Sequence, residues 1–521
     1  MQIKESSFLG KISAFFPSFL LTLTSLLNTY SKTYVVSSPE HIGRLLIILW
    51  IFLVIIIWLG YKLTRNWQLV GFLLSVFVIG FYLTEAFSYL VIFFSGLVFG
   101  AWFLFTYILK KKRETIQMTY LSNVIVITLL LLSGIRLFPA FLLVDWPIYW
   151  NTLANSKISL PIPETVPENK PDIYYIILDS YGRSDILQEY YHYDNSEFIK
   201  YLTNKGFVVP LNIHSNYPMT TLSVPSTLNM EYTQNIVSGT DDSYFWWLMG
   251  PYVEENRVQL FLKNSGYQSI SISTGWDVTN NTSTDLHFKT RAIHLDQFER
   301  FFLAETPIKI FRPLLEKIAF LSTYNSHREL ILYNFETLAN VSKIPGPKFV
   351  FAHIEAPHPP FVFDRDGTYL TPAYNFSIAD GDSFPGTDNE YRAAYVGQVE
   401  FINGKLQKTI DIILAQSQTP PIIILQADHG PRMLNAPQSL DQICPNEAFS
   451  IFAAFYLPGL KKSPIPDEIT PVNIFRIVLN EYFSTHLPLL ENISYSNEDS
   501  IRVYRTQNIQ SRLTDKCELQ P

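Results

Sequence analysis

The sequence predicts an α/β protein in two parts: an N-terminal five-helix transmembrane bundle, followed by a domain with a doubly wound, mostly parallel sheet. Three observations support this fold class. The chain is 48% apolar and only 16% charged, and its long apolar segments fall in the first 145 of 521 residues. Beyond them, short apolar runs alternate with segments of helical periodicity, the pattern of a sheet covered by helices on both faces. Several of these short runs end in aspartate or histidine.

Five apolar segments are candidate membrane spans, because several approach the ~20 residues that a bilayer requires. A signal peptide does not account for them, since they continue long after the first. Basic residues precede the first span and follow the second and fourth, which predicts a cytoplasmic N-terminus and an extracytoplasmic second part. The spans cover Ile12–Tyr30, Leu45–Tyr61, Leu69–Leu83, Leu90–Leu109 and Leu121–Val144.

The predicted domains are a transmembrane domain at 1–145, a juxtamembrane segment and linker at 146–171, and a soluble domain at 172–521. Four prolines between Pro161 and Pro171 make the end of the linker a stiff, extended spacer.

The composition of the soluble domain limits its partners. The net charge of −7 is concentrated there, without a long basic stripe, so we do not expect nucleic acid as a partner. The two cysteines of the chain, Cys444 and Cys517, both lie in this domain. An oxidising exterior would allow a disulfide between them, and two free thiols are the alternative.

Short apolar, β-prone runs and segments of helical periodicity alternate through the soluble domain. The expected strands are Ile173–Leu178, Tyr267–Thr274, Lys348–Ala352, Ile422–Leu425 and Ser450–Leu457. The expected helices are Ser196–Lys205, Tyr391–Leu414 and Val472–Phe483. A further helix is expected near Pro225, with this proline in its first turn.

Three of the expected strands lead into acidic or imidazole side chains. These are Asp179 after the first, His353 and His358 after the third, and Asp428 with His429 after the fourth. Ligands of open α/β sheets bind beyond the carboxyl ends of the strands, which all face one edge of a parallel sheet. Aspartate and histidine there can hold a divalent metal. The alternative is an aspartate that caps a turn and a histidine that faces solvent.

Residues 212–230 are crowded with hydroxyl side chains. A hydroxyl at a helix N-terminus lies at the positive end of the helix dipole. Beside a metal it would lose its proton more easily and become a nucleophile. A Ser/Thr-rich cap and turn is the alternative.

The order of these motifs resembles the alkaline phosphatase/sulfatase superfamily. More narrowly, the chain is similar to its membrane-anchored members, the lipid A phosphoethanolamine transferases and lipoteichoic acid synthases, which have five N-terminal spans and an extracytoplasmic sulfatase-like domain. The segment from Thr220 to Pro225 resembles the nucleophile segment of the transferases, in which a threonine stands three residues before Ser-Val-Pro. The resemblance implies a protein of a bacterial-type cytoplasmic (inner) membrane.

The resemblance also assigns roles to matching residues. Thr220 matches the nucleophile, Asp179 the first metal-ligand acid, Asp428 and His429 the Asp-His-Gly pair, and His358 the histidine at the substrate phosphate. The chain has Asp179 where the transferases usually have glutamate.

Sulfatases convert the first residue of C/S-x-P-x-R to formylglycine, and here Ser223 begins that pattern but Thr227 stands in the arginine position. This departure disfavours a formylglycine sulfatase.

We therefore expect a membrane-bound, metal-dependent phosphotransferase or phosphodiesterase that moves a phosphoryl unit from a phospholipid-type donor to an envelope glycan or lipid. Thr220 and His358 are the expected catalytic residues, with Ser223 or Thr221 as alternative nucleophiles. One divalent ion, Zn²⁺ or Mn²⁺ rather than Ca²⁺ or Mg²⁺, would be bound by Asp179, Asp428 and His429, with Thr220 as the fourth ligand.

Three further side chains are candidates for binding substrate, or structural residues: His353, Arg432 and Ser223. Two alternative functions stay open. One is a sulfatase-family hydrolase of sulfate or phosphate esters, and the other is a non-catalytic envelope assembly protein with a relic site.

Overall fold

The computed structural model describes part of the chain. The described residues are 8–33, 37, 41–67, 69–71, 73–74, scattered positions between 127 and 138, 170–237, 246–290, 295–306, 314, 316–318, 322–370, 384–434, 443–497 and 502–517. The chain forms two compact units, Met1–Val144 with Leu295–Leu315, and Asp145–His294 with Glu316–Pro521. Each unit is described by itself.

The first unit contains the helices α1 (Phe8–Thr33) and α2 (His41–Thr64). Among the described residues, α2 is the helix that is both long and apolar enough to cross a membrane. Its Ile47, Ile51 and Val54 are each more than half exposed. Most of the predicted third, fourth and fifth spans lies outside the described residues, so the five-helix bundle stays a prediction.

The same unit includes a helix from much later in the chain, α13 (Gln297–Glu305). Its Phe298 and Phe302 are buried with residues of α1 and α2 in one apolar cluster. Asp296 and Glu299 form a capping box at the start of α13, where burial raises the pKa of Glu299. Arg44 of α2 pairs with Glu299 at 3.2 Å. The predicted boundaries assign this segment to the soluble domain, and nothing in its local sequence sets it apart.

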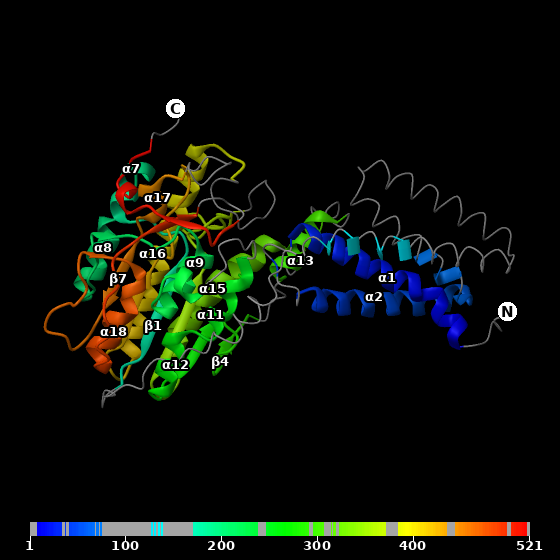
Figure 1. The fold of residues 1–521 in the computed structure, drawn as a ribbon, viewed down its shortest axis with the longest axis horizontal. Helices are drawn as coiled ribbons and strands as arrows, with labels where there is room; N and C mark the ends of the chain where they lie inside the picture. Colours follow the sequence, from blue (N-terminus) through cyan, green and yellow to red (C-terminus); the bar gives the residue numbers. More distant parts are fainter. Residues whose placement is uncertain are drawn as a thin grey trace. The chain divides into compact units, whose positions relative to one another are not determined.

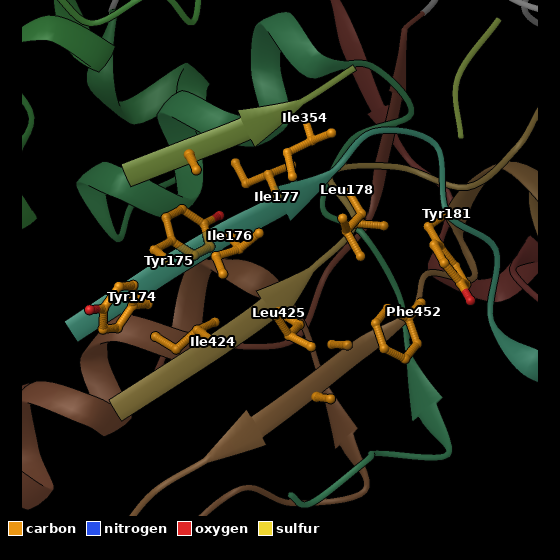
Figure 2. Close-up of a cluster of buried hydrophobic side chains, with 14 of the residues drawn as sticks. Tyr174, Tyr175, Ile176, Ile177, Leu178, Tyr181, Ile354, Ile424, Leu425 and Phe452 are labelled. Carbon is orange, nitrogen blue, oxygen red and sulfur yellow. The ribbon is translucent and has the colours of Figure 1, made fainter. Parts of the chain in front are cut away.

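The second unit is built on a six-stranded sheet, and helices lie around its strands (Figure 1). All strand pairs are parallel except the last, in which β7 runs antiparallel to β6, as Figure 2 shows. In spatial order the strands are β4 (Leu286–Phe288), β3 (Gln268–Ile272), β5 (Lys348–Ile354), β1 (Ile173–Leu178), β6 (Ile422–Gln426) and β7 (Ala453–Tyr456). The predicted mostly parallel sheet is confirmed.

Strand β1 lies between β5 and β6 and is buried along its whole length. Side chains leave it toward both faces, and Tyr175 packs edge-on against Phe475 with ring centroids 5.1 Å apart (Figure 2). Such burial on both faces explains why β1 is a continuous apolar run rather than an alternating one. Its register places Leu178 beside Ile354 and Ile177 beside Gln426, so the three strands end at the same edge.

The helices of this unit form two groups, and the helices of each group contact other members of the same group. One group comprises α7 (Ser184–Tyr191), α8 (Ser196–Asn204), α15 (Thr323–Val341) and α16 (Asp388–Gln416). The other comprises α9 (Thr220–Asn229), α11 (Gly250–Glu254), α12 (Arg257–Asn264) and α18 (Ile474–Phe483). The remaining elements are β2 (Asn212–Ile213), α10 (Thr233–Ile236), η1 (Trp246–Met249), α17 (Pro445–Phe449), β8 (Glu468–Ile469), η5 (Pro471–Asn473), β9 (Tyr495–Asn497), β10 (Thr506–Asn508) and η6 (Gln510–Arg512).

One predicted helix start is wrong. Helix α9 begins at Thr220, so Pro225 lies in its interior rather than in its first turn. Proline has no N–H, and the carbonyl of Thr221 therefore receives no bond from position 225. Because α9 begins at Thr220, this residue lies in the first turn, at the positive end of the helix dipole.

The two cysteines form a disulfide between Cys444 and Cys517, which decides between the two alternatives that the sequence left open. Cys444 immediately precedes α17, and Cys517 lies in the C-terminal segment. The bond closes a covalent loop over a sequence separation of 73 residues.

Replacing both cysteines by serine should lower the free energy of unfolding by about 4 kcal/mol, because an unlinked loop of this length gains conformational entropy when it unfolds. The measurement is thermal unfolding of the full chain in detergent. Wild-type protein with a reductant should match the double variant, and an unchanged Tm in both would contradict the estimate.

Candidate metal centre

Asp179, Asp428 and His429 meet at the carboxyl edge of the sheet. Asp179 follows β1, and the other two follow β6. Each offers one ligand atom such that all three atoms lie within 4.8 Å of one another. All three side chains are at most 2% exposed. The parallel pairing of β1 with β6 therefore brings together residues that are far apart in the sequence.

The carboxylate of Asp179 has the surroundings of a cation ligand. Both of its oxygens are buried and accept no hydrogen bond from the described residues. They face imidazole nitrogens instead, with His353 Nε2 at 3.3 Å and His429 Nε2 at 3.5 Å. Burial alone would raise the pKa of Asp179, but the nearby His358, His353 and His429 hold it well below its usual value. A buried anionic carboxylate that faces imidazole nitrogens rather than backbone N–H groups fits a site for a metal ion.

The ring of His429 is oriented for metal binding. Its Nδ1 lies 2.8 Å from the carbonyl oxygen of Gly430, so Nδ1–H donates to this carbonyl. The lone pair is then on Nε2, which lies 3.5 Å from Asp179 and 3.7 Å from Asp428. A backbone carbonyl that fixes the tautomer in this way is the usual second partner of a metal-bound imidazole.

The hydroxyl of Thr220 joins the cluster from the first turn of α9. Its Oγ1 donates to Asp428 Oδ2 at 2.6 Å, and the side chain is 2% exposed. One turn further, Ser223 Oγ donates to the carbonyl oxygen of Asp428 at 2.6 Å. Ser223, a candidate substrate-binding residue, is fully buried and holds the backbone of the ligand segment.

His358 and His353 lie on two sides of Asp179. His358 N–H donates to the Asp179 carbonyl at 3.1 Å, and its ring centroid is 6.2 Å from that of His429. His353 is fully buried; its Nδ1 is 2.8 Å from Thr279 Oγ1 and its Nε2 faces Asp179. Burial alone would lower the pKa of His353, and Asp179 outweighs that effect, so the pKa is raised.

Arg432 lies two residues beyond the Asp-His-Gly turn and is partly buried. Loss of solvent lowers the pKa of its guanidinium to about 10, against the opposite influence of Asp179 and Glu447. It stays charged near neutral pH and balances part of the acidic charge at this edge.

Several positioning residues carried no signal in the sequence. Tyr395 of α16 donates to the Ser180 carbonyl at 2.9 Å and accepts from Gly182 N–H at 3.1 Å, which fixes the turn after Asp179. Gln398, one turn further, donates to the His358 carbonyl at 3.1 Å. Both lie on a buried face of α16. The helical spacing of residues on that face indicates burial, but it does not distinguish a core residue from one that bonds the site.

A family model described as "Sulfatase" matches residues 171–478, more than half of the chain. The chain belongs to the sulfatase family. The match covers the whole sheet and every residue of the candidate metal centre. The domain is thus a sulfatase-like hydrolase or transferase of the alkaline phosphatase superfamily.

Several solved structures resemble this sulfatase-family chain at low identity. The C-terminal periplasmic domain of EcEptC from Escherichia coli has a TM-score of 0.43 at 13% identity, over 65% of this chain and 93% of that one. The C-terminal periplasmic domain of phosphoethanolamine transferase EptC from Campylobacter jejuni has a TM-score of 0.37 at 12% identity, over 61% and 92%. The phosphonate monoester hydrolase of Agrobacterium radiobacter has a TM-score of 0.40 at 12% identity, over 63% and 80%. No curated protein sequence shows significant similarity to the chain.

Purified full-length protein should contain about one equivalent of a divalent metal, and Asp428→Asn should lose it, because the variant removes an anionic ligand and the acceptor of the Thr220 hydroxyl. Elemental analysis by mass spectrometry measures the metal content of the wild-type protein and of the variant. Asp411→Asn, at an exposed site on α16, is the matched control and should keep its metal. Full metal content in Asp428→Asn would show that the ion binds elsewhere.

Proposed function

We propose that the chain is a membrane-bound, metal-dependent phosphotransferase or phosphodiesterase in which Thr220 is the nucleophile. The observation that carries this proposal is the placement of the Thr220 hydroxyl, 2.6 Å from Asp428 Oδ2 in the first turn of α9. A neutral threonine is a weak nucleophile, and activation requires a nearby positive potential. The helix dipole and a cation bound by the cluster would both supply it.

A divalent ion, Zn²⁺ or Mn²⁺, held by Thr220 and the three cluster residues, would lower the pKa of the hydroxyl and polarise a phosphoryl oxygen. Because the hydroxyl hydrogen points to Asp428, the lone pairs of Thr220 Oγ1 face away from that carboxylate. Asp428 is itself held by Ser223 and by Ser180 N–H, which donates to its Oδ1 at 3.2 Å. The nucleophile is therefore oriented before substrate binds, as efficient displacement requires.

Thr220 would pass its hydroxyl proton to Asp428 Oδ2, which accepts the hydrogen bond of this hydroxyl. Thr220 Oγ1 would then attack phosphorus and form a phosphothreonine ester while the bond from phosphorus to the donor oxygen breaks. His358 would give a proton to the departing oxygen. Its Nδ1 is 2.5 Å from the Pro359 carbonyl, so this nitrogen donates to the backbone and the ring is held in one orientation. An acceptor hydroxyl or water would then give its proton to His358 and attack phosphorus, and Thr220 would leave with the proton held by Asp428.

The structure gives no support to a formylglycine sulfatase. The residue that such an enzyme would convert, Ser223, is fully buried and donates to the Asp428 carbonyl. Thr220, one turn earlier, carries the hydroxyl that touches the ligand cluster. Phosphoryl transfer to Thr220 accounts for this arrangement better than sulfate ester hydrolysis at position 223.

A membrane location would suit a phospholipid-type donor and an envelope glycan or lipid acceptor. The exposed apolar side chains of α2 support anchoring in a bilayer. The Cys444–Cys517 disulfide supports an oxidising, extracytoplasmic compartment for the catalytic domain.

The packing within the first unit supports the predicted orientation. His41 pairs with Asp296 at 3.2 Å and Arg44 with Glu299, so the start of α2 and residues 295–306 lie on one side of the membrane. If residues 295–306 are extracytoplasmic, the start of α2 would be too, and α1 would begin on the cytoplasmic side. The distribution of lysine and arginine predicts the same orientation.

Thr220→Ala should lower turnover of a p-nitrophenyl phosphodiester by about 10³-fold or more, because the covalent step is lost. Thr220→Ser is the matched control: it keeps the nucleophilic oxygen and should be trapped as a phosphoserine by mass spectrometry. Full activity of Thr220→Ala would overturn the nucleophile assignment and leave Ser223 or Thr221.

The same proteins should be given a labelled phospholipid and an acceptor alcohol. Label on the acceptor identifies a transferase, and release of the head group into water identifies a hydrolase. Neither product, in protein that binds metal, would favour the non-catalytic alternative.

In spheroplasts, a membrane-impermeant maleimide should label Lys32→Cys, at the exposed end of α1, but not Arg65→Cys, at the opposite end of α2. Both variants should react after the membrane is opened with detergent. Labelling of Arg65→Cys alone in intact spheroplasts would reverse the proposed orientation.

A further inference from the structure

The short helix α17 is hydrogen-bonded to all three segments that carry the candidate metal ligands. Three consecutive carbonyls, the last two of α17 and that of the following residue Ser450, accept backbone N–H groups from those segments. The bonds are Gly430 N–H to Ala448 O (2.7 Å), Ser215 N–H to Phe449 O (2.8 Å) and Arg183 N–H to Ser450 O (3.1 Å).

Each of these donors belongs to a different part of the centre. Gly430 follows His429 directly, Arg183 lies on the segment after Asp179, and Ser215 lies on the segment that leads to Thr220. The last carbonyls of a helix have no partner inside the helix, so they are free to bind neighbouring backbone. At α17 they align the three ligand segments against one short element.

The contact with the Asp-His-Gly turn is very close. A Cβ atom at position 430 would lie 2.1 Å from the carbonyl oxygen of Glu447 and 3.0 Å from the backbone of Ala448. Glycine at this position therefore allows the turn to lie directly on α17. Any displacement of α17 moves the turn that carries Asp428 and His429.

The side chain of Glu447 makes the second connection. Its Oε1 accepts from Met433 N–H at 3.1 Å and from the Tyr191 hydroxyl at 2.5 Å, and its Oε2 accepts from Leu434 N–H at 3.0 Å. Glu447 is fully buried, and Arg432 is the cation that lies near it. The carboxylate thus holds the segment after the Asp-His-Gly turn, while the backbone of α17 holds the turn itself.

We propose that Glu447 and helix α17 position the metal ligands: they set the mutual placement of Asp428, His429 and Thr220 without touching metal or substrate. Direct hydrogen-bonded partners of metal ligands typically change metal affinity by about 10–100-fold when they are removed, and Glu447 acts one contact further away, so we expect the low end of that range. The proposal rests on the metal-dependent function proposed above. Glu447 is therefore a positioning residue, and its effect should be seen in metal binding before any substrate is added.

Glu447→Gln is the decisive variant. Glutamine keeps the volume and one acceptor oxygen, but its amide NH₂ group faces an N–H donor at Met433 or Leu434. Titration of metal-free, full-length protein with Zn²⁺ alone in a calorimeter should show about 10-fold weaker binding than wild type. With saturating Zn²⁺, kcat for a phosphodiester should fall several-fold while KM changes by less than about twofold, because the substrate contacts are intact.

Glu231→Gln is the matched control. Glu231 is partly buried, whereas Glu447 is fully buried, and it pairs with Arg476 at 3.8 Å beyond the C-terminal end of α9, away from Thr220. The Glu231→Gln variant should have a lower Tm than wild type and the same Zn²⁺ affinity. Equal Zn²⁺ affinity in Glu447→Gln and wild type overturns the positioning role and leaves the proposed function intact. No Zn²⁺ or Mn²⁺ binding by wild type overturns the proposed function instead.

If Glu447→Gln does not fold, Tyr191→Phe tests the same carboxylate more gently. It removes the hydroxyl donor and leaves both backbone donors in place. Zn²⁺ binding should then weaken by about two- to fivefold, as the loss of one hydrogen bond predicts. Unchanged affinity in folded Tyr191→Phe, with kcat also unchanged, would count against the proposal.

Discussion

The buried negative charge at the edge of the sheet is the constraint on which the rest of this site depends. Asp179 and Asp428 have almost no access to solvent, and an isolated carboxylate in such a place is costly unless positive groups compensate it. The chain supplies three imidazoles around Asp179 and a hydroxyl and a backbone N–H to Asp428. That set satisfies Asp428 through hydrogen bonds but gives Asp179 only partial compensation, which suits a cation at this edge of the sheet.

The order of the strands in the sheet places the compensating groups beside the buried carboxylates. Because β1 lies between β5 and β6 in a parallel arrangement, the residues that follow all three strands converge at one edge. The same order buries β1 on both faces, so the position with the strongest packing also carries Asp179. Packing and chemistry are therefore coupled at β1, and a register shift of one residue would move Asp179 away from both neighbours.

Much of the sheet and its ligand edge could be predicted because the signals are local. Short apolar runs that end in Asp179 or in Asp428 and His429 carry both the strand and the residue after it. The start of α9 was misplaced because Pro225 favours the first turn of a helix, whereas tertiary contacts tolerate it in the interior.

The supporting contacts could not be predicted, because they join distant segments through groups that every chain has. Tyr395 and Glu447 bond backbone carbonyls and N–H groups. Every residue has a backbone carbonyl, and all but proline have an N–H, so the amino-acid sequence does not indicate which of them a side chain will bond. The packing of α13 on α1 and α2 likewise depends on two phenylalanines, a residue type that is found in the core of both units.

The central strands β1 and β6 are far apart in the sequence, so they are synthesised at different times. Asp179 emerges early, but the Ser180 N–H that follows it bonds a carboxylate 248 residues later. At ribosomal speeds of about 5–20 residues per second, β1 waits on the order of ten to fifty seconds for β6. During that time Asp428 and His429 have not yet been synthesised, so the candidate ligand set is incomplete. The centre is assembled only when the last central strand has joined the sheet.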